Sequence, residues 1–355
     1  MTVLSNRKEV AFIISLNFNP GHVSHMMASY KQCEELGYIS YYYVVKEFMN
    51  FLPKGPRTLV YGQDTIKSCD LAIFLFPARA NLKLIWQLKH RNDSKIVYIF
   101  HEPLAPMRVY REAGFSYKYL AKLWLINHIS ALTVKWSDVI LLPSKKAVKF
   151  YEQNKRYKNK NYHYLPLLFD DENIEEYAKI ERKYFSYIGT VAADHSFNEF
   201  LQFVEKAVSD GDMPNIKFLI ATKSEFEVPK ALKESPRVVI RKGKPLSNDE
   251  INEAYVSTFV VWNAYARTTQ SGVLAKSFMF GTPAVVLKEN LNEFMEDGKT
   301  VKAIEDNKSF EEIEKAVSAI TSSFESFSSA ARKRFEDTFY YLKYNEKMKN
   351  ILLSL

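Results

Sequence analysis

Apolar and polar positions along the chain form two alternating kinds of segment. Short, almost unbroken apolar runs, of which VAFIISL at 10–16 is the first, are typical of strands buried on both faces of a parallel sheet. Longer segments with helical spacing lie between several of them, and the first ends at Leu36, before Gly37. Further strand-like runs lie at 40–45, 59–61, 71–76, 96–100 and 139–142. Strands that alternate with helices predict a doubly wound parallel sheet.

A second series of the same kind follows the acidic segment DDENIEEYAKIERK at 170–183, which we interpret as a linker or short helix. Its predicted strands lie at 184–188, 217–220, 237–240, 258–262 and 284–287. The shift in composition after Pro166 divides the chain into two domains, 1–166 and 167–334, followed by an amphipathic helical region at about 328–353. We expect an α/β protein with two doubly wound domains facing a cleft.

The stretch QSGVLAKSFMFGTPAVV at 270–286 predicts a helix of roughly nine residues between two loops. Ser271 is placed to cap its first turn, and Gly281 stands where a helix end commonly requires positive φ. Gly272 allows the backbone to come close to a ligand. Since ligands of doubly wound sheets bind at the carboxyl ends of strands, we expect this helix to point its N-terminus at a phosphate.

Composition bounds the class of protein. Of 355 residues, 47% are hydrophobic and 25% charged, which is typical of a globular chain of two domains. Cys33 and Cys69 are too few for a disulfide framework or a zinc site and are expected to be reduced core thiols. The first residues lack the apolar core of a signal peptide, and no window reaches the ~18 apolar residues of a membrane span. We expect a cytoplasmic protein.

A formal charge of +8 favours anionic partners. The run KKAVKFYEQNKRYKNK at 145–160 contains a single acid and fits a solvated helix and loop, an anionic membrane surface or, third, a nucleic acid. The segment Tyr117–Trp136, rich in Leu, Trp and Tyr with three lysines, fits either a packed helix of the first domain or an interfacial face on anionic lipid. The peripheral membrane interpretation thus stands beside a purely structural one.

Two loops of the first domain carry side chains suited to a ligand. Pro20, Gly21 and His22 follow the first strand, in a sequence that fits a site loop or an ordinary turn. His101 and Glu102 follow the run IVYIF, where each is placed to act as a general base, to contact a substrate or to serve structure alone. Asp210-Gly211-Asp212 looks like a metal motif but follows a predicted helix, so we expect a surface turn and no catalytic metal.

The segments SGVLAKSFMFGTPAVV and NEFMEDGKTVKAI (292–304) resemble the nucleotide-sugar-binding half of GT-B glycosyltransferases, especially the family 4 group that builds bacterial polysaccharides. PSKKAVKFY (143–151) is similar to the segment that closes that family's first domain, and YFSYIGTVAADHSFNEFLQFV (184–204) to its second-domain strand and helix. AARKRFEDTFYYLKY (330–344) resembles its last helix. The resemblance implies two Rossmann-like domains, with a helix at about 335–355 crossing back to complete the first.

The resemblance also implies a donor site, and this sequence departs from it. Aligned on Gly281 and Pro283, the family's two glutamates, which contact the donor sugar and the ribose, fall on Thr268 and Lys276. An ammonium donates hydrogen bonds only, so Lys276 cannot replace a ribose-binding carboxylate and is expected to reach a phosphate or an acidic sugar.

The family's phosphate-binding Arg and Lys fall on Thr190 and His195. Backbone amides and the cations Arg241, Lys244 and Arg267 would then hold the diphosphate. The full set of implied donor-site residues is Thr190, His195, Arg241, Lys244, Arg267, Thr268, Thr269, Gln270, Ser271, Gly272, Val273 and Lys276.

These observations lead to a glycosyltransferase that moves a sugar from a nucleotide diphosphate sugar to a growing bacterial surface glycan, free or lipid-linked. Helix dipole, amides and cations would neutralise the leaving group without a metal or other cofactor, and retention or inversion stays open. A degenerate or noncatalytic GT-B protein that binds a glycan or nucleotide is the alternative, suggested by the missing glutamates. A nucleic-acid-binding protein, suggested by charge alone, is not the partner class we expect.

Overall fold

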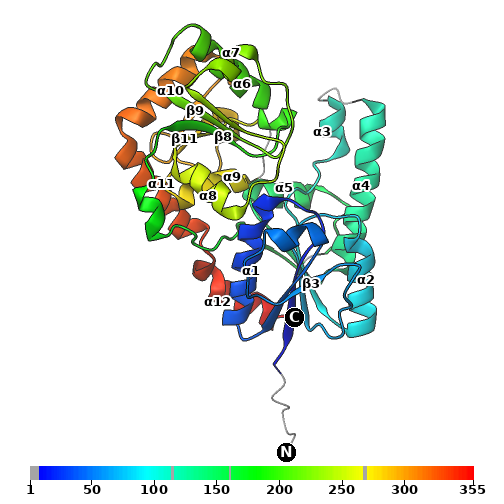
Figure 1. The fold of residues 1–355 in the computed structure, drawn as a ribbon. Helices are drawn as coiled ribbons and strands as arrows, with labels where there is room; N and C mark the ends of the chain where they lie inside the picture. The colour runs from blue at the N-terminus through cyan, green and yellow to red at the C-terminus, as the bar shows by residue number, and fades with distance from the viewer. Residues whose placement is uncertain (1–7, 113–115, 160, 267–269) are drawn as a thin grey trace, which may run out of the picture. The chain divides into compact units, whose positions relative to one another are not determined.

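The computed structural model describes residues 8–112, 116–159, 161–266 and 270–355. The chain divides into two compact units (Figure 1). Unit 1 runs to Leu168 and also takes up Tyr344–Leu355, and unit 2 is Phe169–Lys343. The sequence places the corresponding boundaries after residues 166 and 334.

Unit 1 contains a seven-stranded parallel sheet in the order β3-β2-β1-β4-β5-β6-β7. Its strands are β1 Val10–Ser15, β2 Ile39–Val44, β3 Thr58–Val60, β4 Leu71–Phe74, β5 Lys95–Ile99, β6 Val139–Leu142 and β7 Tyr162–Tyr164. Its helices are η1 Pro20–His22, α1 Val23–Glu35, η2 Lys46–Asn50, α2 Asn81–Asn92, α3 Met107–Glu112, α4 Tyr117–Trp136, α5 Lys145–Gln153 and α12 Asn345–Leu353.

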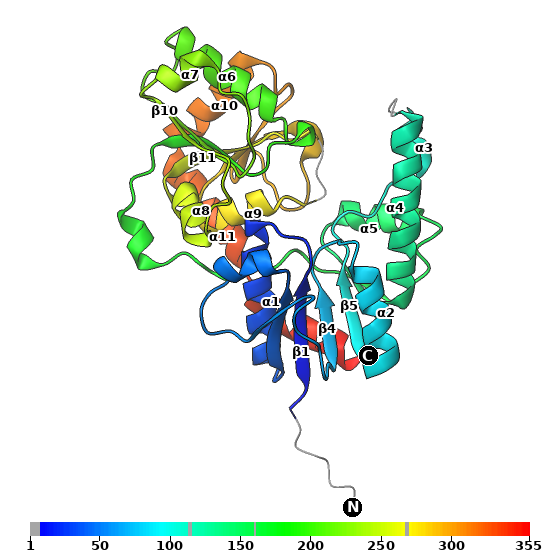
Figure 2. The same cartoon turned by 45° about the vertical axis from the view of Figure 1, so that its right-hand side comes forward.

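Both faces of this sheet are covered, as the unbroken apolar runs require. Helices α1 and α12, blue and red in Figure 2, cover one face, where Val23 and Met26 share a core with Met348 and Ile351. A hydrogen bond of 3.0 Å from Gln32 Nε2 to Asn345 Oδ1 joins the same two helices. The last helix of the chain therefore completes the first unit, as predicted.

Unit 2 contains a six-stranded parallel sheet in the order β10-β9-β8-β11-β12-β13. Its strands are β8 Tyr184–Ile188, β9 Lys217–Ala221, β10 Val238–Arg241, β11 Thr258–Asn263, β12 Ala284–Leu287 and β13 Val301–Ile304. Its helices are η3 Glu175–Lys179, η4 Ala193–His195, α6 Phe197–Ser209, α7 Lys230–Glu234, α8 Asn248–Val256, α9 Gly272–Met279, η5 Lys288–Asn290, α10 Phe310–Ser322 and α11 Phe324–Thr338, with η6 Tyr341–Tyr344 at the boundary. An aromatic core that includes Phe185, Phe200 and Trp262 packs on one face of the sheet.

Three elements differ from the prediction. The edge strands β7 and β13 were not predicted, because their sequences YHY and VKAI are short and contain polar residues. The region 328–353 is not one helix: α11 ends at Thr338, and α12 begins at Asn345. Phe169 pairs with the chain at the break, because its amide donates to the carbonyl of Phe339 at 2.9 Å and its carbonyl accepts from the amide of Tyr341 at 3.1 Å. Those backbone groups are thereby withdrawn from a continuous helix.

No helix within the described parts of the chain combines the length and the hydropathy needed to cross a bilayer.

Candidate functional site

Both sheets have a switch point, where the strand order reverses. In unit 2 it lies between β8 and β11, because the chain proceeds from β8 to β9 and β10 on one side and from β11 to β12 and β13 on the other. In unit 1 it lies between β1 and β4 for the same reason. Ligands of open parallel sheets bind outside the carboxyl ends of the strands at such points. The loops after these four strands are therefore the candidate ligand-binding loops.

Helix α9 begins at the switch point of unit 2. Ser271 caps it, since its Oγ accepts a hydrogen bond from the amide of Leu274 at 3.2 Å. The same Oγ accepts from Asn263 Nδ2, at the end of β11, at 2.8 Å. Gly281 follows the helix with φ of 64°, as predicted. The cap fixes the first turn of α9 beside the end of β11, and the amides and positive dipole end of that turn suit an anion.

The loop after β8 comes close to the first turn of α9. Gly189 has φ of 146°, and a Cβ placed there would lie 3.7 Å from Val273 Cγ2 and 3.9 Å from the Tyr265 hydroxyl. Beyond it, the Thr190 carbonyl accepts hydrogen bonds from the Tyr187 hydroxyl at 2.7 Å and from His195 Nδ1 at 3.0 Å. The His195 ring stacks on Tyr265 with ring centroids 4.4 Å apart. Of the residues assigned to the donor site, the structure thus brings together Thr190, His195, Ser271, Gly272 and Val273.

The remaining assigned cations and polar residues lie outside the pair of segments formed by the loop after β8 and the first turn of α9. Arg241 ends the edge strand β10, with Lys244 in the loop after it, and both side chains are exposed. Two strand spacings, roughly 10 Å, separate β10 from β8. Gln270 directly precedes the cap of α9, and Arg267, Thr268 and Thr269 lie outside the described residues.

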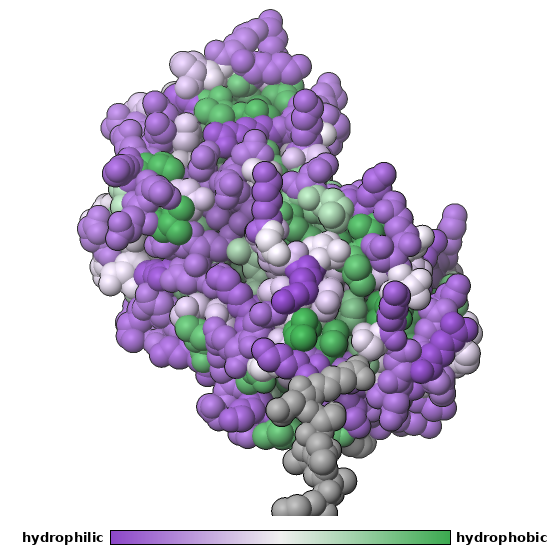
Figure 3. Space-filling view, turned by 60° about the horizontal axis from the view of Figure 1, so that its bottom comes forward, coloured by the Kyte–Doolittle hydropathy of each residue, from purple (hydrophilic) through white to green (hydrophobic). Residues whose placement is uncertain are grey.

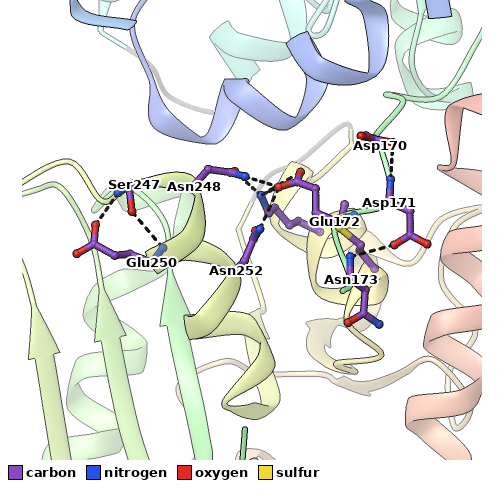
Figure 4. A network of polar contacts seen from close by, with 10 residues as sticks. Asp170, Asp171, Glu172, Asn173, Ser247, Asn248, Glu250 and Asn252 are labelled. Atoms are coloured by element: carbon purple, nitrogen blue, oxygen red, sulfur yellow. Dashed lines mark hydrogen bonds and ion pairs between the residues drawn. The ribbon is translucent and has the colours of Figure 1, made fainter. Parts of the chain in front are cut away.

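Lys276 belongs to a buried polar network with Glu172, Asn248 and Asn252, and Figure 4 labels these three partners. Its Nζ donates to Asn248 Oδ1 at 2.8 Å and lies 3.4 Å from Glu172 Oε2. That same Glu172 oxygen accepts from Asn252 Nδ2 at 3.0 Å and from Asn248 Nδ2. Burial lowers the pKa of Lys276, and the carboxylate of Glu172 opposes that shift. In this structure the ammonium is directed at Glu172 and Asn248, and contact with a ligand stays a prediction.

At the switch point of unit 1, a stack of rings joins the predicted loops. Pro20, Gly21 and His22 form η1 after β1, where Asn19 Oδ1 accepts from the amide of Gly21 at 3.3 Å. The His22 ring stacks on Phe76 at 3.4 Å between centroids, and Phe76 stacks on His101 at 4.6 Å. The loops after β1, β4 and β5 thus meet through their side chains, and a pocket beside them is lined by His25, Ser29 and Gln32 among other residues.

His101 is held as a neutral imidazole. Its Nε2 donates to the carbonyl of Leu75 at 2.5 Å, which leaves Nδ1 as the acceptor. Removal from water, with the nearby imidazole of His25, lowers its pKa to about 3. Glu102, the next residue, is exposed. A base with so low a pKa accepts a proton weakly at neutral pH, which argues against His101 as the general base.

Comparison with known proteins identifies the fold. No family model matches the chain, and no curated protein sequence matches it. Sucrose-phosphate synthase from Thermosynechococcus elongatus matches with a TM-score of 0.70 and 9% identity, over 98% of this chain and 99% of its own. HepE from Anabaena, in complex with UDP and glucose, matches with a TM-score of 0.69 and 11% identity, over 98% and 100%. A glycosyltransferase from Rickettsia africae matches with a TM-score of 0.64 and 11% identity, over 97% and 99%.

The chain has the GT-B fold. This confirms the fold class predicted from the sequence. The identities are low, so the match concerns the path of the chain and leaves its ligands to be argued from its own residues.

Two sequence motifs remain to be placed on this GT-B fold. Asp210-Gly211-Asp212 follows α6 as an irregular segment, where Lys206 forms an ion pair with Asp210 at 2.5 Å. Among the described residues, no three His, Cys, Asp or Glu side chains gather as a metal-binding group. Within the basic run, Lys145–Gln153 forms α5, capped by Ser144, with Ala147 and Tyr151 buried.

Some residues of the site carry signals that sequence analysis did not use. Asn263 is a polar residue at the end of the apolar run FVVWN, and Gly189 directly follows a strand, so both have the pattern of strand-end site residues. Glu172 has no such signal, because nothing in the acidic segment distinguishes the one carboxylate that pairs with Lys276.

Proposed function

We propose that this GT-B chain is a glycosyltransferase, a hexosyltransferase that moves a sugar from a nucleotide diphosphate sugar to a growing bacterial surface glycan. The observation that carries the proposal is the N-terminus of α9, capped by Ser271 and set against the Gly189 loop at the switch point of unit 2. We assign the donor to this site and the acceptor to the loops of unit 1.

The proposed mechanism is electrostatic. Amides of the first turn of α9 and the positive end of its dipole stabilise the diphosphate as the bond to the sugar breaks. Arg241 and Lys244, at and beyond the end of β10, would add positive charge from two strand spacings away, and we add Arg267 from the sequence. No metal ion is required. In an inverting reaction, Glu102 would take the proton of the acceptor hydroxyl, with the neutral His101 beside it.

UDP sugars are the first donors to test. HepE has been solved with UDP-glucose, and the pneumococcal GtfA, an O-GlcNAc transferase, with UDP and GlcNAc. We place the reaction on the cytoplasmic side of a membrane, with a free or lipid-linked glycan as acceptor. The buried thiols of Cys33 and Cys69 fit a reducing compartment.

Isothermal titration with UDP, GDP, ADP and CDP tests the donor site. The proposal expects selective binding of one diphosphate, and weaker binding by Gly272→Val, which places a side chain at the first position of α9. If duplex or single-stranded nucleic acid binds instead, with steep salt dependence, the positive charge of the chain rather than a donor site accounts for its ligand binding.

A binding protein without transferase activity is the second candidate, and the Lys276–Glu172 pair favours it. The position that holds a ribose-binding glutamate in the family this chain resembles is here occupied by a lysine within a buried ion pair. Selective nucleotide binding without turnover of any nucleotide sugar would support this candidate over the first.

A further inference from the structure

Helix α4 has large apolar side chains on two opposite faces. Leu123 and Val134 lie on the inner face, where they are buried against the rest of unit 1. Leu125, Ile129 and Leu132 lie on the other and are 56%, 39% and 41% exposed. Their spacing of four and three residues puts them in one stripe along the helix. A helix that packs by one face alone has no need of the second stripe.

Aromatic and cationic side chains surround this stripe. Tyr117 and Trp124 are exposed on the same helix, and Lys118, Lys122 and Lys135 are exposed as well. The guanidinium of Arg156 lies 5.7 Å from the centre of the Trp124 ring. The segment 117–136 contains no Asp or Glu.

The exposed stripe differs from an ordinary surface. On the face drawn in Figure 3, hydrophilic side chains predominate and hydrophobic ones form small groups, as is usual for a folded domain. On α4, seven large apolar side chains are exposed within sixteen positions, from Tyr117 to Leu132, with cations as the charged residues between them. Contiguous apolar surface of this kind marks an interaction site.

We propose that the outward face of α4 is a docking surface for an anionic lipid bilayer, with the helix lying along the headgroups. Leu125, Ile129 and Leu132 enter the acyl boundary, while the lysines contact lipid phosphates. The charge selects this occupant: a second copy of the chain would set one cationic face against another, whereas an anionic surface complements it. The site uses no residue of the proposed transfer reaction, so either proposal can fail without the other.

Vesicle sedimentation tests the proposal on the full chain. The wild type should sediment with vesicles of phosphatidylcholine and phosphatidylglycerol and much less with phosphatidylcholine alone. Leu125→Gln/Ile129→Gln/Leu132→Gln should weaken that binding by about tenfold or more, because each side chain loses its apolar contact with lipid. Met49→Gln/Leu353→Gln, which changes two exposed apolar residues elsewhere in unit 1, is the control and should bind as the wild type does.

Two further measurements keep the test decisive if the triple variant folds poorly. Lys118→Glu/Lys122→Glu/Lys135→Glu leaves the apolar stripe intact and should release the protein from anionic vesicles. Brominated lipids should quench wild-type tryptophan emission, with less quenching in Trp124→Phe. A wild type that ignores anionic vesicles, or a folded triple variant that binds them unchanged, overturns the proposal. Dimers in sedimentation velocity that only the triple variant abolishes would assign the face to a second copy and overturn it too.

Discussion

Lys276 and Glu172 form a buried ion pair across 104 positions of the sequence. The Nζ and Oε2 atoms lie 3.4 Å apart, and the two side chains are only 5% and 6% exposed. Two buried charges lose much of their hydration, and Asn248 and Asn252 supply hydrogen bonds that replace part of it. Each member of the pair therefore depends on the other.

Lys276→Glu should destabilise unit 2 by ~3–5 kcal/mol, because it sets two carboxylates side by side in a buried place. We expect weaker nucleotide binding as a result, although the change restores the glutamate of the family that the chain resembles. Urea denaturation and nucleotide titration measure the two effects. Lys276→Glu/Glu172→Lys, which restores opposite charges, should recover part of the stability. Tighter binding and faster turnover in Lys276→Glu alone would instead identify a degenerate transferase.

Ser271→Ala should cost ~1 kcal/mol of stability by removing the cap of α9, and should also weaken diphosphate binding. The second effect follows because the cap holds the first turn, whose amides contact the anion in the proposed site. Ser144→Ala is a matched control, since Ser144 caps α5 through the amide of Ala147 at 3.0 Å. It should lose similar stability and keep full nucleotide affinity. Equal diphosphate affinity in both variants would show that the N-terminus of α9 does not contact the diphosphate.

His101 should make the fold sensitive to acid. Its pKa is about 3 in the folded chain, against an ordinary value of 6.5. Between these values the unfolded chain binds the proton and the folded chain does not, so stability falls as pH decreases from 6.5 toward 3. The loss from this group at pH 5 should reach at most about 2 kcal/mol.

His101→Gln, which keeps a donor for the Leu75 carbonyl without titrating, should remove that part of the pH dependence. Thermal melting of both proteins at neutral pH and at pH 5 gives the comparison, with the exposed His90→Gln as control. Parallel loss of stability in the wild type and His101→Gln would show that His101 is protonated without penalty.

Transferase activity should survive EDTA, because the proposed leaving-group stabilisation comes from amides, the α9 dipole and cationic side chains. The assay measures release of the nucleoside diphosphate from the selected nucleotide sugar. Complete loss of activity that Mn²⁺ restores would show that a metal ion takes part.

Sequence patterns predicted most elements of this fold, because the determining signals are local. The cap at Ser271 and the positive φ at Gly281 both belong to residues next to α9, and the unbroken apolar run at Val10–Ser15 requires cover on both faces of a sheet wherever it lies. Elements without such signals were missed. β7 and β13 are edge strands of three and four residues, so neighbouring strands, rather than their own hydrophobicity, make them strands.

The sequence by itself determined the two doubly wound domains and the helix α9, since periodicity, caps and strand ends are properties of adjacent residues, and its resemblance to a known family added the GT-B architecture. Only the tertiary structure decided which distant groups meet. It set Gly189 beside Val273, stacked His22 and His101 on Phe76, and paired Lys276 with Glu172. It also left the stripe of α4 exposed. These relations depend on the strand order and on packing between segments far apart in the chain, which no local pattern of residues specifies.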